Sequence, residues 1–393
     1  MHQHHYGFRR SMPLAVLLLG VVCFASTAQA GPREQAKRLH DRLTGVPASA
    51  TTLDSMAAMI AGGDALGAAL SATEHPSFLN TTVREYATPW SNEDRSVYVE
   101  LNDTTATVIG AVRDDLSFDQ VLYEDIVYVG SDAVSNTPYA QENNDHYREL
   151  AEDGVDLSDP AVLVQTTQSS LPGTELGPDQ TSGLLTTRGY AESFLVAGTN
   201  RAAVRFATLN FLCLDMEDMR DVTAWPDRVR QDVSRSPGGD SAIYLNDCLP
   251  CHAGLDALSG AFAYYDFDEE ETRLTYTPGV VQPKYLRDAG VFRFGFETLG
   301  DSWINYWRTG PNAHVGWQGP GSGTGAKSFG LEISQTRRFA ECQVEQVMEK
   351  VCHRKPNGSA DLMAVQAIAD DFEANNKNLR RVFAASAVHC MGD

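Results

Sequence analysis

The chain has 393 residues, of which 21% are charged, and its formal net charge at pH 7 is −21. A surface this acidic repels phosphate backbones, so we expect no nucleic-acid partner. The 32 glycines and 17 prolines are typical of a globular protein, and the length leaves room for two domains or one large one.

Residues 1–30 have the three parts of a secretory signal peptide. Arg9 and Arg10 precede an apolar run from Leu14 to Phe24, and Ala28-Gln29-Ala30 has the small residues of a cleavage site. Cleavage after this triplet removes two arginines and no acidic residue, so the net charge falls from −21 to −23. No later stretch approaches about 18 apolar residues, so we expect no transmembrane segment in the mature chain and a periplasmic, extracellular or envelope-associated location.

Residues 31–180 are predicted to be a helical N-terminal region. The segment AKRLHDRLTG (36–45) ends at a glycine stop, and a Gly-Gly pair breaks the Ala- and Leu-rich segment 53–75 into two helices. Loop-like segments from 130 to 183 mark the boundary. The remaining residues, 181–393, begin with a helix predicted for RAAVRFATLNFLCL (201–214).

The most informative motif is Cys-x-x-Cys-His, formed by Cys248, Cys251 and His252. Covalent haem attachment requires two thiols one short turn apart and an imidazole directly after the second thiol to bind the iron. We therefore expect one covalent haem c on Cys248 and Cys251, with His252 as the proximal iron ligand.

Three other interpretations of the motif are weaker. A thioredoxin-like dithiol would follow an apolar strand in a βαβ unit, whereas the preceding residues are short and mixed. A structural zinc site needs a second close pair of ligands, and no such pair follows. Chance occurrence is the third alternative.

Two segments between residues 262 and 300 predict a small β-hairpin insertion. RLTYTPGVVQPKYL (273–286) and GVFRFGFET (290–298) both alternate apolar and polar residues.

Three helices are predicted near the C-terminus. The first covers SQTRRFAECQVEQVMEKVC (334–352), the second starts after an N-cap at Ser359 and is buried through Leu362, Val365, Ile368 and Phe372, and the third is NLRRVFAASAVHC (378–390).

The cysteines outside the motif are predicted to form two disulfides. Cys23 leaves with the signal peptide, and Cys342 and Cys352 lie about 15 Å apart along one helix, too far to pair with each other. If the three helices pack antiparallel, the end of the third meets the end of the first, which pairs Cys352 with Cys390. Cys213 is then left for Cys342.

The sixth iron ligand has several candidates. His314, on a loop between Trp307 and Trp317, is the most distinctive and is our tentative distal ligand. Met348 and Met363 lie on apolar helix faces, where a core role is expected. The other candidates are His353, His389 and Met391.

The segment CLPCHAGLDALSGAFAYYDF (248–267), with the upstream TSGLLTTRGYAESFLVAGTNRAAVRFATLNFLCLD (181–215), resembles a planctomycete-type family of uncharacterised, secreted, cytochrome c-related proteins. In that family the haem segment continues with Asp-Pro-Leu-Gly, which Asp256 and Leu258 match, whereas Ala257 replaces the proline and Ser259 precedes Gly260. The Thr-x-x-x-Arg segment of the family is echoed by Thr199-Asn200-Arg201. The resemblance implies a secreted, mostly helical haem protein.

The sequence thus predicts a mainly α fold, with helical bundle regions, a cytochrome c-like haem half and a small β-hairpin. The leading functional hypothesis is an exported monohaem c-type cytochrome that transfers one electron to or from a protein partner. One alternative is a peroxidase-like haem enzyme or gas-binding protein with an open sixth position. Another is an interaction protein in which haem only stabilises the fold.

Overall fold

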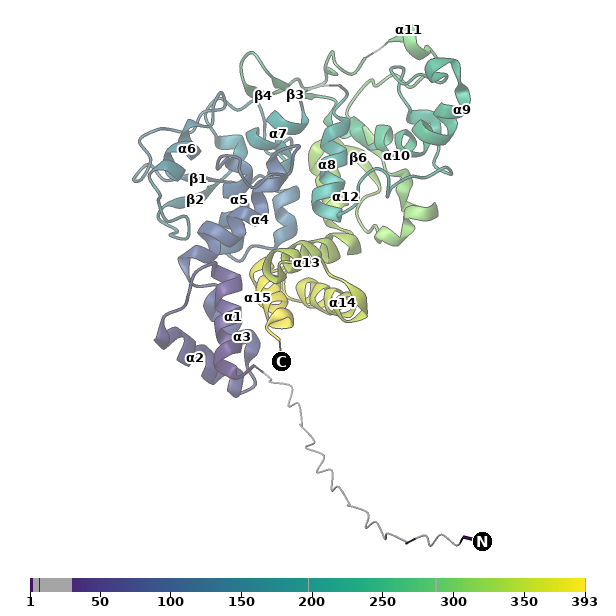
Figure 1. Cartoon of the computed structure of the whole chain (residues 1–393). Coiled ribbons are helices and arrows are strands. Elements are labelled where there is room, and N and C mark those ends of the chain that lie inside the picture. Colours follow the sequence, from purple (N-terminus) through teal and green to yellow (C-terminus); the bar gives the residue numbers. More distant parts are fainter. Residues whose placement is uncertain (3–6, 8–29, 197, 287, 393) are drawn as a thin grey trace.

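Helices account for 54% of the structure, and the strands form only three short antiparallel pairs, so the mainly α fold is confirmed. The computed structural model describes residues 1, 2, 7, 30–196, 198–286 and 288–392 (Figure 1). Most of the predicted signal peptide, residues 1–30, lies outside the described residues. No helix in the described ranges combines the length and the apolar character that a membrane span requires.

The connections between α-helices and strands vary in length, and the longest include the segments 167–187 and 213–240. The helices are α1 (Pro32–Thr44), α2 (Ala50–Ala61), α3 (Ala65–Ala72), α4 (Arg84–Ala87), α5 (Asp103–Arg113), α6 (Asp145–Glu152), α7 (Arg188–Phe194), α8 (Arg201–Leu212), α9 (Ser241–Ile243), α10 (Leu249–Ser259), α11 (Ala289–Phe292), α12 (Gly325–Ser334), α13 (Arg337–Cys352), α14 (Gly358–Ala374) and α15 (Leu379–Cys390). The strands are β1 (Val127–Gly130), β2 (Leu163–Thr166), β3 (Tyr265–Asp268), β4 (Arg273–Tyr276), β5 (Ser302–Ile304) and β6 (Ser322–Thr324).

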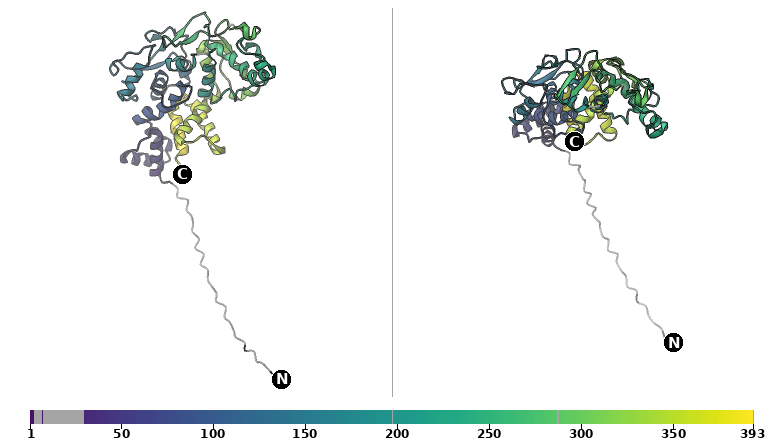
Figure 2. Two further views of the ribbon diagram at one scale, coloured as in Figure 1. Left: turned by 45° about the horizontal axis from the view of Figure 1, so that its top comes forward. Right: turned by 90° about the horizontal axis from the view of Figure 1, so that it is seen from above.

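The two ends of the chain pack against each other. In Figures 1 and 2 the purple helices α1–α3 lie beside the yellow helices α13–α15, and α1 and α3 both contact α15. Three α1 side chains donate hydrogen bonds to the last carbonyl groups of the chain: Gln35 to Gly392 (2.9 Å), Arg38 to Met391 (2.8 Å) and Arg42 to Cys390 (2.6 Å). The predicted regions 31–180 and 181–393 therefore share an interface at the chain ends, and the boundary near residue 180 stays a prediction.

Helix α5 lies at the centre of the N-terminal region. Ten consecutive residues, 103–112, are buried, as expected for a helix surrounded by other elements. The Asn102 side chain caps the helix by accepting a hydrogen bond from the Thr105 amide at 3.0 Å. The buried Asp103 carboxylate accepts the first backbone N–H groups of α7, from Arg188 (2.6 Å) and Gly189 (2.9 Å), and so joins α7 to α5.

Helix α8 connects the C-terminal helices with the segment that carries the Cys-x-x-Cys-His motif. It packs on α13 on one side and on α10 on the other, as Figure 1 shows at the centre of the molecule. At its end, Cys213 forms a disulfide with Cys342 of α13. The second disulfide joins Cys352, at the end of α13, to Cys390, at the end of α15. These are the two pairings expected from the order of the helices.

Two details of the C-terminal helices differ from the prediction. Helix α14 begins at Gly358, with Asn357 as its N-cap, rather than after Ser359. Leu362 is 55% exposed, whereas Val365, Ile368 and Phe372 are buried. The buried position at this end of the helix belongs instead to its neighbour Asp361, which accepts a hydrogen bond from Arg354 and pairs with His389 of α15.

The predicted β-hairpin exists, but one of its two strands comes from a different segment. Strand β4 pairs with the upstream strand β3, with Phe267 opposite Leu274. Residues 290–298 form no extended strand and contribute α11 and one isolated bridge, from Phe296 to Arg230. The short connection 269–272 favours the local antiparallel pair over the more distant one.

Candidate functional site

The Cys-x-x-Cys-His motif lies at the start of α10. A π-helical turn, Tyr244–Cys248, runs directly into this helix, whose second residue is Pro250. Cys248 and Cys251 are both half-buried free thiols, while the other four described cysteines are paired. Burial raises the pKa of the Cys251 thiol, which donates a hydrogen bond to the Met216 carbonyl at 3.4 Å.

His252 is oriented by a carboxylate one turn further along α10. Its Nδ1 atom lies 3.1 Å from Oδ1 of Asp256, whose side chain is 0% exposed. Burial alone would raise the pKa of Asp256, but the hydrogen bond from His252 and the charges of Arg201 and Arg230 outweigh it and hold this pKa well below its usual range. An ionised carboxylate only accepts hydrogen bonds, so Nδ1 carries the proton that joins it to Asp256. With the proton held there, Nε2 is the ring nitrogen that can offer a lone pair to a metal ion.

Two arginines from other segments hold Asp256. Arg201, the first residue of α8, donates to its carboxylate from Nε (2.7 Å) and Nη2 (3.0 Å) and also forms a two-bond ion pair with Asp232. The backbone N–H of Arg230 donates to Oδ2 of Asp256 at 3.0 Å. The Arg230 side chain is 1% exposed and donates to Thr199 Oγ1 at 2.8 Å. Two cations and two carboxylates therefore balance one another behind His252.

The tripeptide Thr199-Asn200-Arg201 anchors the start of α8 to this network. Asn200 adopts the left-handed conformation, with φ of 51°, which asparagine tolerates better than most residues. Its side-chain amide donates to the carbonyls of Phe262 and Tyr265, both at 2.9 Å. Only the family resemblance drew attention to this tripeptide in the sequence. Arg230 and Asp232 carried no sequence signal, because they meet Asp256 and Arg201 only through the fold.

Apolar side chains surround the motif. A small buried cluster of Val229, Val233, Tyr244 and Ala253 packs against Cys248. Most of the large apolar side chains that are exposed in the described part of the chain also fall between residues 222 and 299: Val222, Trp225, Ile243, Leu245, Val280, Leu286, Val291, Phe294 and Leu299. Ile243 and Leu245 immediately precede the motif, and the Asp221 amide, beside Val222, donates to the Pro250 carbonyl at 2.8 Å.

These features fit a covalently attached haem. The two free thiols have the required spacing and His252 presents Nε2 as a ligand. The exposed Val222, Ile243 and Leu245, which lie next to the motif in sequence or through the Asp221–Pro250 hydrogen bond, offer apolar surface for a flat apolar ring. Among the described residues, no group of three or more His, Cys, Asp or Glu side chains is arranged to hold a metal ion.

The opposite face of α10 is fixed by a close approach to Trp307. A Cβ atom on Gly254 would lie 2.1 Å from Cε2 of Trp307, so only glycine lets the indole ring pack this closely. Trp307 is fully buried. The position of the helix that carries the motif is therefore tightly determined.

His314 lies on a short 3-10 segment, Gly310–Val315, and is exposed. Its Nδ1 atom is 2.8 Å from the Pro311 carbonyl. Two residues earlier, the Asn312 side chain donates to the Met219 carbonyl at 2.9 Å, which ties this segment to the stretch 219–221, whose Asp221 amide donates to the Pro250 carbonyl. The role of His314 as distal ligand stays a prediction.

The other five ligand candidates belong to the C-terminal helices, which pack on α8 and on the N-terminal helices (Figure 1). Met348 is buried in the core, Met363 is 63% exposed, and His353 is exposed at the end of α13. Nε2 of His389 is paired with Asp361 at 2.8 Å, and Met391 follows the last helix. All five candidates therefore lie on or next to α13–α15 and not on α10, which carries the motif.

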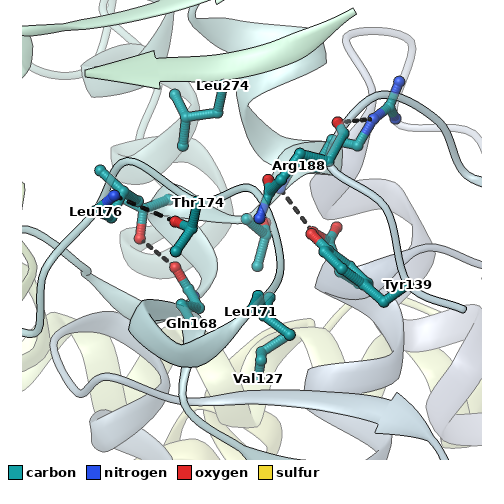
Figure 3. Close-up of a pocket in the computed structure, with 12 residues that line it drawn as sticks. Val127, Tyr139, Gln168, Leu171, Thr174, Leu176, Arg188 and Leu274 are labelled. Carbon is teal, nitrogen blue, oxygen red and sulfur yellow. Dashed lines mark hydrogen bonds between the residues drawn. The ribbon is translucent and has the colours of Figure 1, made fainter. Parts of the chain in front are cut away.

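A small polar cavity lies away from the motif, beside α5 and α7 (Figure 3). Its lining includes Gln168, Tyr139 and Arg188, and its free volume of about 10 Å³ leaves room for one water molecule at most. None of the residues predicted to bind haem lines this cavity.

Compared with known proteins, the chain shows no significant match to a family, to a curated protein or to a solved structure.

Proposed function

We propose that this chain is an exported monohaem c-type cytochrome that transfers single electrons. The observation that carries the proposal is the state of the six described cysteines. Four of them form disulfides, and the two that remain free are those of Cys-x-x-Cys-His. The two disulfides also favour an oxidising compartment, which agrees with export.

Cys248 and Cys251 would hold the haem through thioether bonds, and His252 would bind the iron through Nε2. When bound, haem supplies an iron centre that cycles between the ferric and ferrous states. Asp256 holds the Nδ1 proton of His252 and so fixes the tautomer and the ring orientation. The apolar side chains around Cys248 keep water away from this side of the motif. His314 is our proposal for the sixth ligand, and the resemblance to the planctomycete-type family remains part of the proposal.

The test is expression with a c-type haem maturation system. We expect an intact mass that exceeds the apoprotein by one haem, a pyridine haemochrome spectrum of thioether-bound haem, and a reversible reduced-minus-oxidised spectrum. Replacement of both motif thiols, C248S/C251S, should abolish attachment. The matched variant C352S/C390S removes the same number of thiols outside the motif and should keep its haem. Apoprotein mass for the correctly matured wild type would refute the proposal.

One observation favours a second candidate, a peroxidase-like haem enzyme or gas-binding protein. An ionised carboxylate on the proximal imidazole raises the electron density of the ligand, which suits chemistry at an open sixth position. A high-spin spectrum that shifts on addition of cyanide, in wild type and in H314A alike, would support this candidate. A low-spin spectrum that becomes high-spin in H314A would support electron transfer with His314 as the ligand.

A further inference from the structure

Asp256 accepts more hydrogen bonds than are needed to orient an imidazole. A backbone carbonyl is enough to hold the Nδ1 proton of a ligand histidine. Here a fully buried carboxylate accepts from His252, from two nitrogens of Arg201 and from the backbone of Arg230. Because an isolated buried carboxylate is costly, such a network stabilises the ionised form against its surroundings.

The two arginines are themselves well held. The guanidinium group of Arg230 donates to Thr199 and Thr298 and lies 4.8 Å from the centre of the Tyr285 ring. Arg201 shares its charge between Asp256 and Asp232. The network is electrically balanced, so its effect on His252 comes mainly from the hydrogen bond rather than from a net charge.

We propose that Asp256 is a positioning residue that lowers the reduction potential of the iron by acting through His252. This inference rests on the proposed function. A hydrogen bond to an ionised carboxylate draws the proton away from Nδ1 and increases the electron density at Nε2, which favours the more positive, oxidised iron. Reduction takes one electron from a one-electron donor, and no bond of the protein chain forms or breaks.

The experiment compares D256N with D232N in haem-loaded protein. Both substitutions remove one negative charge beside Arg201, but only Asp256 touches His252. In a redox titration with dithionite and ferricyanide, we expect D256N to shift the potential upward by clearly more than D232N. In resonance Raman spectra of the ferrous protein, the iron–imidazole stretch should move to lower frequency in D256N if this state is five-coordinate, and should stay unchanged in D232N.

Equal potential shifts in the two variants would overturn the inference, because they would indicate simple charge effects. An unchanged potential in D256N would overturn it as well. These outcomes differ from failure of the proposed function, which shows earlier as wild-type protein without attached haem.

Nitrogen NMR of His252 in the unloaded full chain provides a second measurement if D256N does not mature. We expect the Nδ1–H tautomer to dominate in wild type and in D232N, and to lose its dominance in D256N. A dominant Nε2–H tautomer in wild type would contradict the positioning role.

Discussion

Glu149 of α6 organises the loop before its own helix. Its carboxylate accepts from the backbone N–H groups of Thr137 (2.7 Å) and Asn136 (3.0 Å) and from the Ser135 hydroxyl (3.2 Å). Hydrogen bonds from Thr137 and from the backbone of Asn136 lower the pKa of Glu149 from 4.5 to about 2. The ionised form is therefore the one that stabilises the folded chain.

This shift predicts a pH-dependent effect of E149Q. The stabilisation is fully present above the unfolded-state pKa near 4.5 and is lost as the pH falls toward the folded-state pKa near 2. We expect E149Q to melt below wild type at pH 6, and the difference to shrink between pH 4.5 and pH 2, measured by circular dichroism. The control is E152Q, an exposed residue on the same helix with no partner among the described residues, which should match wild type throughout. A difference that stays constant with pH would contradict the assignment.

At the scale of elements, the two disulfides tie α13 to α8 and to α15. They join residues 129 and 38 positions apart in the sequence. In the chain-entropy description, loops of these lengths stabilise the folded state by about 5 and about 4 kcal/mol.

We therefore expect C213S/C342S and C352S/C390S each to lower the free energy of unfolding by about 2–5 kcal/mol, measured by urea denaturation. The longer loop should give the larger loss. A reductant added to wild type should lower the free energy of unfolding by the sum of the two losses. The same reductant should not change the stability of a variant in which all four of these cysteines are replaced by serine. Stabilities equal to wild type, or a peptide map that joins Cys342 to Cys352, would show that these bonds are absent in solution.

Much of this helical framework could be predicted because its signals are local. The spacing of Cys342 and Cys352 on one helix excluded their pairing, and the glycine stop after Thr44 ends α1 as expected. Leu362 was predicted wrongly because helical periodicity did not show that its neighbour Asp361 occupies the buried position, paired with His389. The partner of β4 was also predicted wrongly. Alternation of apolar and polar residues identifies segments that can form strands, but it does not show which of them pair with each other.

The site could be predicted only in part. Cys248, Cys251 and His252 are adjacent in sequence, so their motif is visible without a fold. The charged groups that contact Asp256 are not visible in the sequence, because Arg201 lies 55 residues from Asp256 and Arg230 lies 26 residues from it. The packing of both α8 and the segment around residues 226–232 on α10 brings these charges together.

At the scale of the whole molecule, the net charge, −21 for the full chain and −23 after removal of the predicted signal peptide, predicts how the protein reacts with small redox reagents. If the proposed function holds, a cationic oxidant such as hexaammineruthenium(III) is attracted and the anionic hexacyanoferrate(III) is repelled. In stopped-flow measurements on reduced protein, the rate constant should fall with added salt for the cation and rise for the anion. The uncharged oxidant benzoquinone serves as the control and should show little salt dependence. The opposite pair of slopes would indicate a positively charged electron-transfer surface.

The contact between α1 and the last carbonyl groups of the chain has a consequence for biogenesis. Gln35 and Gly392 are 357 positions apart, so α1 obtains these neighbours only after α15 has been synthesised. Until then, the side of α1 that faces α15 stays uncovered. Exposed surface of this kind makes an incomplete chain prone to misfolding and aggregation, which chaperones prevent. A truncated product that lacks only the final helix would therefore also destabilise the beginning of the chain.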